Sequence, residues 1–160
     1  DAPGDVAACA SIYNYYISRP GDLVTFEEKE VSNEEFRGRM QDVINKGYFW
    51  LLAVTTGEED VHNSGSHPHG NTERIRGYAY ANTYKPRSAY RFSCEDSVYI
   101  EPTFTRRGAG KMLLGELLTR LRQNGETKSV VAVLGTKVST LLPSLPFCFD
   151  RTKHLLTSFF

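Results

Sequence analysis

The sequence predicts a single α/β or α+β domain spanning residues 1–160, in which helices pack against one sheet. Helix-like and strand-like segments alternate in the order αβαβββαβ, and the chain contains no internal repeat. Its 160 residues are 40% hydrophobic and 12% aromatic, which is enough apolar material for one core.

The helices are predicted from apolar side chains that recur at intervals of three and four residues. One such stripe covers residues 5–18. The next helix begins with a capping box, in which the Ser32 hydroxyl accepts from the Glu35 amide and the Glu35 carboxylate reaches back to Ser32, and Gly47 would end it. A further helix covers residues 108–125. The side chains expected to face the core are Val6, Cys9, Ala10, Tyr13 and Ile17, then Phe36, Met40, Val43 and Ile44, then Met112, Leu113, Leu117, Leu118 and Leu121.

The strands are predicted from short segments that are dense in β-branched and aromatic residues. Two of these segments, one on either side of a long polar stretch, are expected to pair as antiparallel neighbours. The expected strands cover residues 23–28, 48–55, 75–84, 93–100 and 129–134.

The polar stretch over residues 56–74 is expected to be a mobile surface insertion. It is rich in Gly, Ser, Asn, Glu and His and lacks any periodicity. Three histidines lie in it, His62, His67 and His69, but no cysteine or second ligand cluster accompanies them. A solvated loop is therefore favoured over a metal site, and no metal is expected.

The charge and composition of the chain argue against several partners. Nineteen basic residues balance nineteen acidic ones, so no long-range field draws the protein to nucleic acid or to an anionic membrane. Cys9, Cys94 and Cys148 show no disulfide or metal pattern, which favours a reducing compartment. No apolar run approaches the ~20 residues that span a bilayer, and the N-terminal residues do not resemble a signal peptide. We expect a cytoplasmic protein.

The segment from Arg106 to Lys111 is the strongest candidate for a binding site. Gly108 and Gly110 let the backbone approach a bound group, and the helix that follows adds its positive N-terminus. The side chains of Arg106, Arg107 and Lys111 would suit a diphosphate. Taken alone, however, the segment fits an anion site and an ordinary loop-to-helix turn with solvated arginines equally well.

Two other phosphate-binding motifs do not fit this segment. A P-loop needs glycine where Thr105 stands and Ser or Thr where Met112 stands. A dinucleotide-binding fingerprint needs a third glycine where Leu113 stands. Neither motif is therefore expected here.

Arg106-Arg107-Gly108-Ala109-Gly110 is similar to the pyrophosphate loop, Gln/Arg-x-x-Gly-x-Gly/Ala, of the GNAT acetyltransferases. Like that loop, it follows a strand and precedes a helix. Further segments resemble the phosphinothricin acetyltransferases in the same order along the chain. The resemblance implies the GNAT acyl-CoA N-acyltransferase fold, a mixed central sheet flanked by helices. The segments that carry it are residues 12–17, 84–90, 94–100 and 128–135.

The resemblance also implies a reaction, in which a small amino-acid-like amine attacks the thioester of acetyl-CoA directly. Glu95 takes the position of the general base, and a homodimer is expected. The implied contacts with acetyl-CoA are Val98, Tyr99, Ile100, Arg106, Arg107, Gly108, Ala109, Gly110 and Lys111. The implied contacts with the amine are Phe26, Lys85, Arg87 and Tyr90.

The chain departs from the family pattern in two places. Thr105 stands where the loop usually begins with Gln or Arg, and residues 136–160 lack the family's helix and final strands. Pro143 and Pro146 exclude a regular helix there. The apolar tail would then cover a sheet edge or pair with a second subunit. A truncated or divergent, non-catalytic homologue that binds acetyl-CoA is therefore the alternative.

Overall fold

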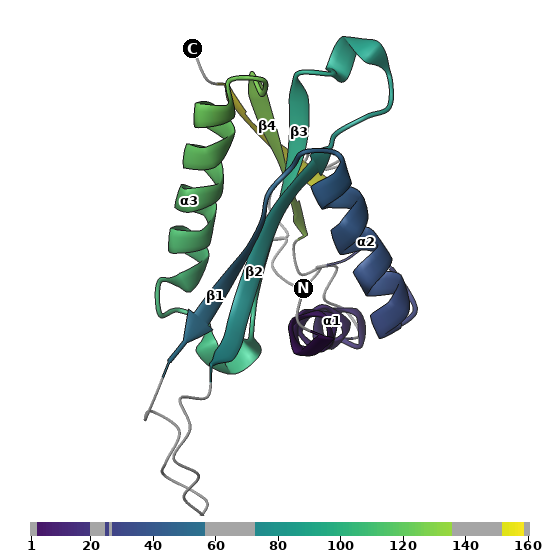
Figure 1. Ribbon diagram of the computed structural model, residues 1–160, viewed down its shortest axis with the longest axis vertical. Helices are drawn as coiled ribbons and strands as arrows, with labels where there is room; N and C mark the ends of the chain where they lie inside the picture. The colour runs from purple at the N-terminus through teal and green to yellow at the C-terminus, as the bar shows by residue number, and fades with distance from the viewer. Residues whose placement is uncertain (1–2, 20–24, 26, 57–72, 136–151, 159–160) are drawn as a thin grey trace, which may run out of the picture.

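The computed structural model describes residues 3–19, 25, 27–56, 73–135 and 152–158 (Figure 1). The predictions for His62, His67, His69 and Phe26 concern residues outside these ranges, as do most of those for the insertion and the tail. Of the strand expected over residues 23–28, the described residues 25, 27 and 28 belong to no strand. The elements are α1 (Pro3–Ile17), α2 (Asn33–Asn45), β1 (Trp50–Thr55), β2 (Arg74–Thr83), η1 (Ser88–Tyr90), β3 (Ser93–Ile100), η2 (Pro102–Phe104), α3 (Ala109–Asn124), β4 (Ser129–Gly135) and β5 (Thr152–Ser158).

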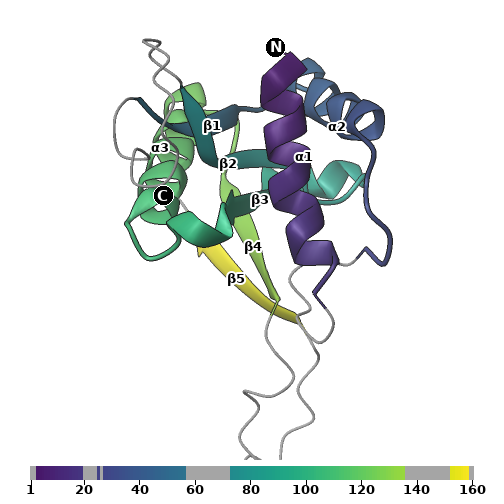
Figure 2. The ribbon, with the colours of Figure 1, turned by 90° about the horizontal axis from the view of Figure 1, so that it is seen from below.

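The strands form one five-stranded sheet in the order β1-β2-β3-β4-β5. The pair β3–β4 is parallel and the other pairs are antiparallel, so the predicted mixed sheet is confirmed. A parallel pair needs a crossover connection, and α3 provides it. The tail strand β5 pairs with β4 along Thr152–Ser158 and covers that edge, one of the two roles expected for the tail, although the sequence did not predict a strand there (Figure 2).

Helices cover both faces of the sheet. Figure 1 shows α3 on one side and α1 and α2 on the other. Successive side chains of β2 point to opposite faces of the sheet: Tyr78 packs with α1 and α2, whereas Ala79 packs against α3. The core on the α1–α2 side contains Val6, Cys9, Tyr13, Phe36 and Met40, and the core on the α3 side contains Cys94, Leu113, Leu117, Leu121 and Val130.

Stacked aromatic rings fill the α1–α2 side of the sheet. The Trp50 ring lies parallel to the Tyr80 ring at 4.5 Å and to the Tyr78 ring at 5.2 Å. Tyr78 in turn stacks on Tyr99 of β3 at 5.2 Å. Each such pair contributes about 0.5–1.5 kcal/mol beyond its buried area, so this stack holds β1, β2 and β3 in register.

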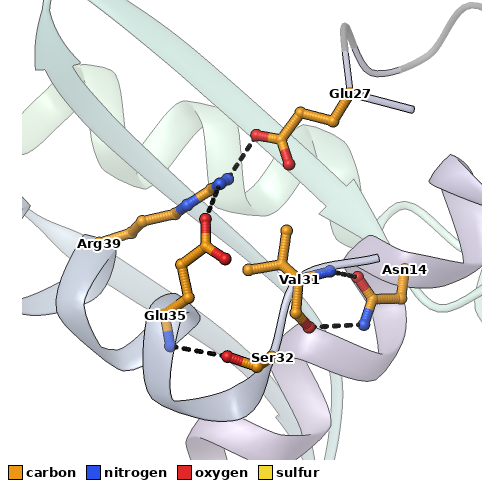
Figure 3. A network of polar contacts seen from close by, with 6 residues as sticks. All are labelled: Asn14, Glu27, Val31, Ser32, Glu35 and Arg39. Atoms are coloured by element: carbon orange, nitrogen blue, oxygen red, sulfur yellow. Dashed lines mark hydrogen bonds and ion pairs between the residues drawn. The ribbon is translucent and has the colours of Figure 1, made fainter. Parts of the chain in front are cut away.

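The predicted start and end of α2 are confirmed, with one change in its capping box. The Ser32 hydroxyl accepts from the Glu35 amide at 3.2 Å, and Gly47 takes a φ of +79° just beyond the helix. The Glu35 carboxylate, however, accepts from Arg39 at 2.6 Å (Figure 3). Asn14 of α1 secures the approach to α2 by two 2.9 Å hydrogen bonds with the backbone of Val31.

Two side chains predicted for the core are exposed. Met112 is 72% exposed and Ile44 is 42% exposed. Met112 is the neighbour of buried Leu113, and Ile44 is the neighbour of buried Val43. Successive residues differ by about 100° around the helix axis, so these two side chains point away from the core. The rest of the predicted stripes is buried or partly buried.

Gly77 marks the tightest approach between β2 and β3, and it supplies a test of this packing. A Cβ there would lie 2.7 Å from the Tyr99 carbonyl oxygen and 2.6 Å from Ile100 Cδ1. We expect Gly77→Ala to lower the free energy of unfolding by about 1–3 kcal/mol in a urea titration. Gly115→Ala is the control, because no described residue lies within 4 Å of its new Cβ and alanine favours the helix by roughly 0.5–1 kcal/mol. Equal effects of the two substitutions would contradict the packing described.

Candidate active site

The parallel strands β3 and β4 part within the sheet. They are paired from Ser93 and Ser129 to Asp96 and Ala132. Beyond these residues β3 continues to Ile100 and β4 continues to Gly135 without pairing to each other, while β4 stays paired with β5 along its whole length. The last four residues of β3 therefore present a backbone edge toward β4 that β4 does not fill.

The pairing of β3 with β2 decides which backbone groups face this opening. The Glu101 amide donates to the Arg76 carbonyl at 2.7 Å, and the Tyr84 amide donates to the Ser93 carbonyl at 3.5 Å. Because the direction of these groups alternates along a strand, the odd-numbered residues of β3 bond to β2. The even-numbered residues bond toward β4.

Val98 and Ile100 therefore turn their amide and carbonyl groups to the opening, whereas those of Tyr99 face Tyr78 of β2. The Ile100 carbonyl already accepts a 2.6 Å hydrogen bond from the Tyr16 hydroxyl of α1. Of the three β3 residues that the resemblance assigned to the donor, Val98 and Ile100 have backbone groups at the opening, and Tyr99 has its side chain in the aromatic stack.

The glycine turn lies at the same end of β3. Gly108, with φ +88°, is the N-cap of α3, and within the described residues no side-chain hydrogen bond caps this helix end. The first backbone bond of the helix runs from the Met112 amide to the Gly108 carbonyl at 3.1 Å, so the three preceding amides are the unbonded donors of a helix N-terminus. The turn packs on the strand, since a Cβ at Gly110 would lie 3.7 Å from Ile100 Cγ1. The three amides belong to Ala109, Gly110 and Lys111.

The basic residues of the turn are on the surface. Arg106, Arg107 and Lys111 are all exposed, and Arg106 has a left-handed φ of +64°. A helix N-terminus with free amides and nearby cations is suited to an anion. The structure therefore joins two features that a phosphorylated extended ligand needs, namely a free strand edge and an anion-binding turn.

Glu95 lies on β3 one residue before the point where β3 and β4 part. It is half-buried and faces Asn82 of β2 across the strand pair. By alternation its side chain is on the α1–α2 side, like that of Tyr99. Burial is the main cause that raises the pKa of Tyr80, and the negative charge of Glu95 also raises it.

The neighbours of Glu95 face the other layer. Cys94 is fully buried against α3, and burial raises the pKa of its thiol to about 11, so the thiol is protonated at neutral pH. Asp96 is half-buried, and burial raises its pKa as well. This agrees with the prediction that Cys94 points away from Glu95 and is not a nucleophile.

The predicted amine-binding residues lie in the connection between β2 and β3. The Lys85 ammonium is 4.9 Å from the ring centre of Tyr84 and 5.4 Å from that of Tyr90. Arg87 is exposed and precedes η1. This connection begins two residues after Asn82, so Lys85 and Tyr90 lie at the Glu95 end of the strands.

Sequence reasoning missed a pocket of about 250 Å³ on the same side of the sheet. Tyr80 and Asn82 form part of its wall, which brings it next to Glu95. Its charged residues are Asp42, Arg39 and Glu27, and the Arg39 guanidinium donates to the Glu27 carboxylate at 2.5 Å (Figure 3). Nothing local in the sequence indicated the pairing of Arg39 with Glu27, which lies 12 residues away.

A second ion-pair cluster anchors the chain that leads into the glycine turn. Glu101, just after β3, accepts from Arg76 at 2.9 Å and from Arg74 at 2.7 Å. The side chains of Arg76 and Glu101 are 8% and 15% exposed. Burial opposes the charge of Glu101, but the bonds from Arg76 and Arg74 outweigh it, so the pKa of Glu101 is lowered.

The Glu101 cluster predicts a pH-dependent loss of stability. Because its pKa is lower in the folded state, Glu101 contributes stability above its ordinary pKa of about 4.5, and this contribution disappears as the pH falls through the lowered value. We expect Glu101→Gln to lower the melting temperature at neutral pH and to differ less from the parent below about pH 4.

The control is Glu116→Gln, which breaks an exposed helical pair with Arg120 and costs at most about 0.5 kcal/mol. Melting temperatures from about pH 3 to pH 7 distinguish the two variants. A pH-independent difference between Glu101→Gln and the parent would contradict the ionic role of Glu101.

Residues 26–148 match the model of the acetyltransferase (GNAT) family, and the chain belongs to that family. It is similar to the phosphinothricin N-acetyltransferase of Alcaligenes faecalis, with 35% identity over 136 residues, 85% of this chain and 59% of the relative. The phosphinothricin N-acetyltransferase of Streptomyces viridochromogenes is 30% identical over 131 residues, 82% of this chain and 61% of that protein. The chain thus spans about three fifths of these curated relatives.

Solved structures agree with the family. A phosphinothricin acetyltransferase of the GNAT superfamily from Sinorhizobium meliloti, in complex with acetyl-CoA, superposes with a TM-score of 0.67. It is 29% identical, and the match covers 84% of this chain and 63% of that one. The predicted GNAT fold is therefore confirmed. Within the described ranges, no helix could span a membrane and no group of three or more acidic, His or Cys residues could hold a metal.

Proposed function

We propose that this protein transfers an acetyl group from acetyl-CoA to the amino group of a small amino-acid-like substrate, of the phosphinothricin or methionine sulfoximine type. One observation carries the proposal: the free backbone edge of Val98 and Ile100 lies beside the uncapped N-terminus of α3. The similarity to phosphinothricin N-acetyltransferases supports the choice of acceptor.

The donor would bind along both features at once. The pantetheine arm would add to β3 as an extra strand, with its amides bonded to the groups of Val98 and Ile100 that face the opening. The diphosphate would take the free amides at the start of α3, and Arg106, Arg107 and Lys111 would add charge. A thioester held by the Val98 backbone then lies close to Glu95, three residues earlier on the strand.

Glu95 would act as the general base. The substrate ammonium gives a proton to Glu95, directly or through a water molecule, and the free amine attacks the thioester carbon. The new C–N bond forms and the C–S bond breaks, and the departing thiolate of coenzyme A takes up the second proton that the amine nitrogen releases. A carboxylate is a much weaker base than an amine, so a water chain between Glu95 and the ammonium would assist the proton transfer.

The acceptor would lie on the α1–α2 side of the sheet, where Glu95 is. Lys85, Arg87 and Tyr90 would hold its anionic groups from the β2–β3 connection, and the prediction for Phe26 stays a prediction. The pocket beside Asn82 gives the remaining volume. Binding of acetyl-CoA without acetylation of any amino acid would favour the non-catalytic alternative.

Gly108→Asp tests the donor site. The substitution places a side chain at φ +88° and a carboxylate where the diphosphate would bind, so we expect the Kd for coenzyme A to rise at least about tenfold in calorimetry. Gly125→Asp is the matched control, since it has a φ of +73° at the other end of α3. If the parent does not bind coenzyme A, or if both variants bind as the parent does, the proposed donor site is wrong.

Glu95→Gln tests the base. We expect kcat to fall by roughly 10²- to 10⁴-fold while the Kd for coenzyme A stays within about twofold, because the amide keeps the shape of the side chain but takes no proton. Asp96→Asn is the matched control, since Asp96 is the next residue and faces the other layer. An active enzyme whose rate is unaffected by Glu95→Gln would contradict the role of Glu95.

A further inference from the structure

The Phe104 ring lies against two guanidinium groups from different parts of the chain. The Arg76 guanidinium is 5.2 Å from the ring centre, and that of Arg107 is 5.0 Å away. Arg76 belongs to β2, whereas Arg107 belongs to the glycine turn. The half-buried ring therefore connects the sheet with an exposed cation of the proposed donor site.

The sheet side of this contact is rigidly bonded. The Arg76 side chain is nearly buried, donates from Nε to Thr55 Oγ1 at 3.0 Å, and forms the ion pair with Glu101. Phe104 is fixed to the same anchor through its backbone, because its amide donates to the Glu101 carbonyl at 2.8 Å. β2 and the end of β3 thus hold both the backbone and the ring of Phe104 in place.

Arg107 differs from Arg76 in what holds it. Within the part of the chain that the structure describes, Arg107 takes part in no ion pair, and its side chain is exposed. A guanidinium stacked on a ring keeps its donors free at the edge of the plane, so it is held in place without losing its capacity to bind an anion.

We propose that Phe104 is a positioning residue for the acyl donor. Its ring holds Arg107 toward the diphosphate of acetyl-CoA, and the Arg76–Glu101 pair holds the ring. This rests on the proposed function, since it assigns the anion at the turn to the donor diphosphate. Without the ring, Arg107 must be ordered by the ligand itself, which weakens binding.

The test compares ligands with and without the diphosphate. We expect Phe104→Leu to raise the Kd for coenzyme A by about three- to tenfold in calorimetry, with no change for pantetheine, which lacks the diphosphate. Phe104→Tyr keeps the ring and should bind coenzyme A as the parent does. A general disturbance of the fold would weaken both ligands alike.

Two further variants isolate the contact. Phe92→Leu is the matched control, because Arg91 lies 4.2 Å from the Phe92 ring on another exposed segment, and it should leave both affinities unchanged. Arg107→Met, at an exposed position that should keep the fold, is combined with Phe104→Leu. If Arg107 is the group that Phe104 positions, the double variant should bind coenzyme A no more weakly than Arg107→Met alone.

The outcomes separate this proposal from the broader one. Additive effects of Phe104→Leu and Arg107→Met, an equal loss for pantetheine, or an unchanged affinity of Phe104→Leu for coenzyme A would overturn the role of Phe104 alone. A parent protein that does not bind coenzyme A would overturn the proposed function, and with it this inference.

Discussion

The parting of β3 and β4 is the constraint on which the rest of this molecule depends. Two parallel strands can be neighbours only if a crossover joins them, and here the crossover is α3, which packs on the sheet through Leu113, Leu117 and Leu121. Because the pairing ends at Asp96 and Ala132, the strand edge that becomes free lies beside the N-terminus of that same helix. The free edge and the anion-binding turn are thus consequences of one connection.

Because side chains and backbone groups alternate in direction along β3, the donor and the acceptor of the proposed reaction would contact different atoms of this strand. Val98 and Ile100 direct their backbone groups to the opening and their side chains to α3, whereas Glu95 directs its side chain to the opposite layer. That layer holds the pocket beside Asn82 and Tyr80. A donor along the backbone edge and an acceptor on the α1–α2 side would therefore meet near Glu95 without competing for the same groups.

Local signals predicted the three helices and the strands β1 to β4, but not β5 or the long-range contacts. Gly47 and Gly125 end helices because their positive φ values, +79° and +73°, favour glycine, and this preference is visible in the sequence. The bonds Asn14–Val31, Arg39–Glu27 and Arg76–Glu101 join residues 17, 12 and 25 positions apart, and no periodicity encodes them. Turn and strand residues of the site were thus predictable, whereas the pocket and the anchor of the turn were not.

The Arg76–Glu101 pair explains how the glycine turn keeps an unfavourable backbone conformation. Arg106 takes a left-handed φ of +64°, which costs of order 1 kcal/mol for a residue with a side chain. Such a conformation persists only where both flanks are fixed, and here they are: Phe104 bonds to the Glu101 carbonyl, and Gly108 begins α3. Since Thr105 supplies no long side chain at the start of the turn, the sheet, acting through Arg76 and Glu101, holds its geometry. The Arg76–Glu101 pair therefore connects β2 with the proposed donor site.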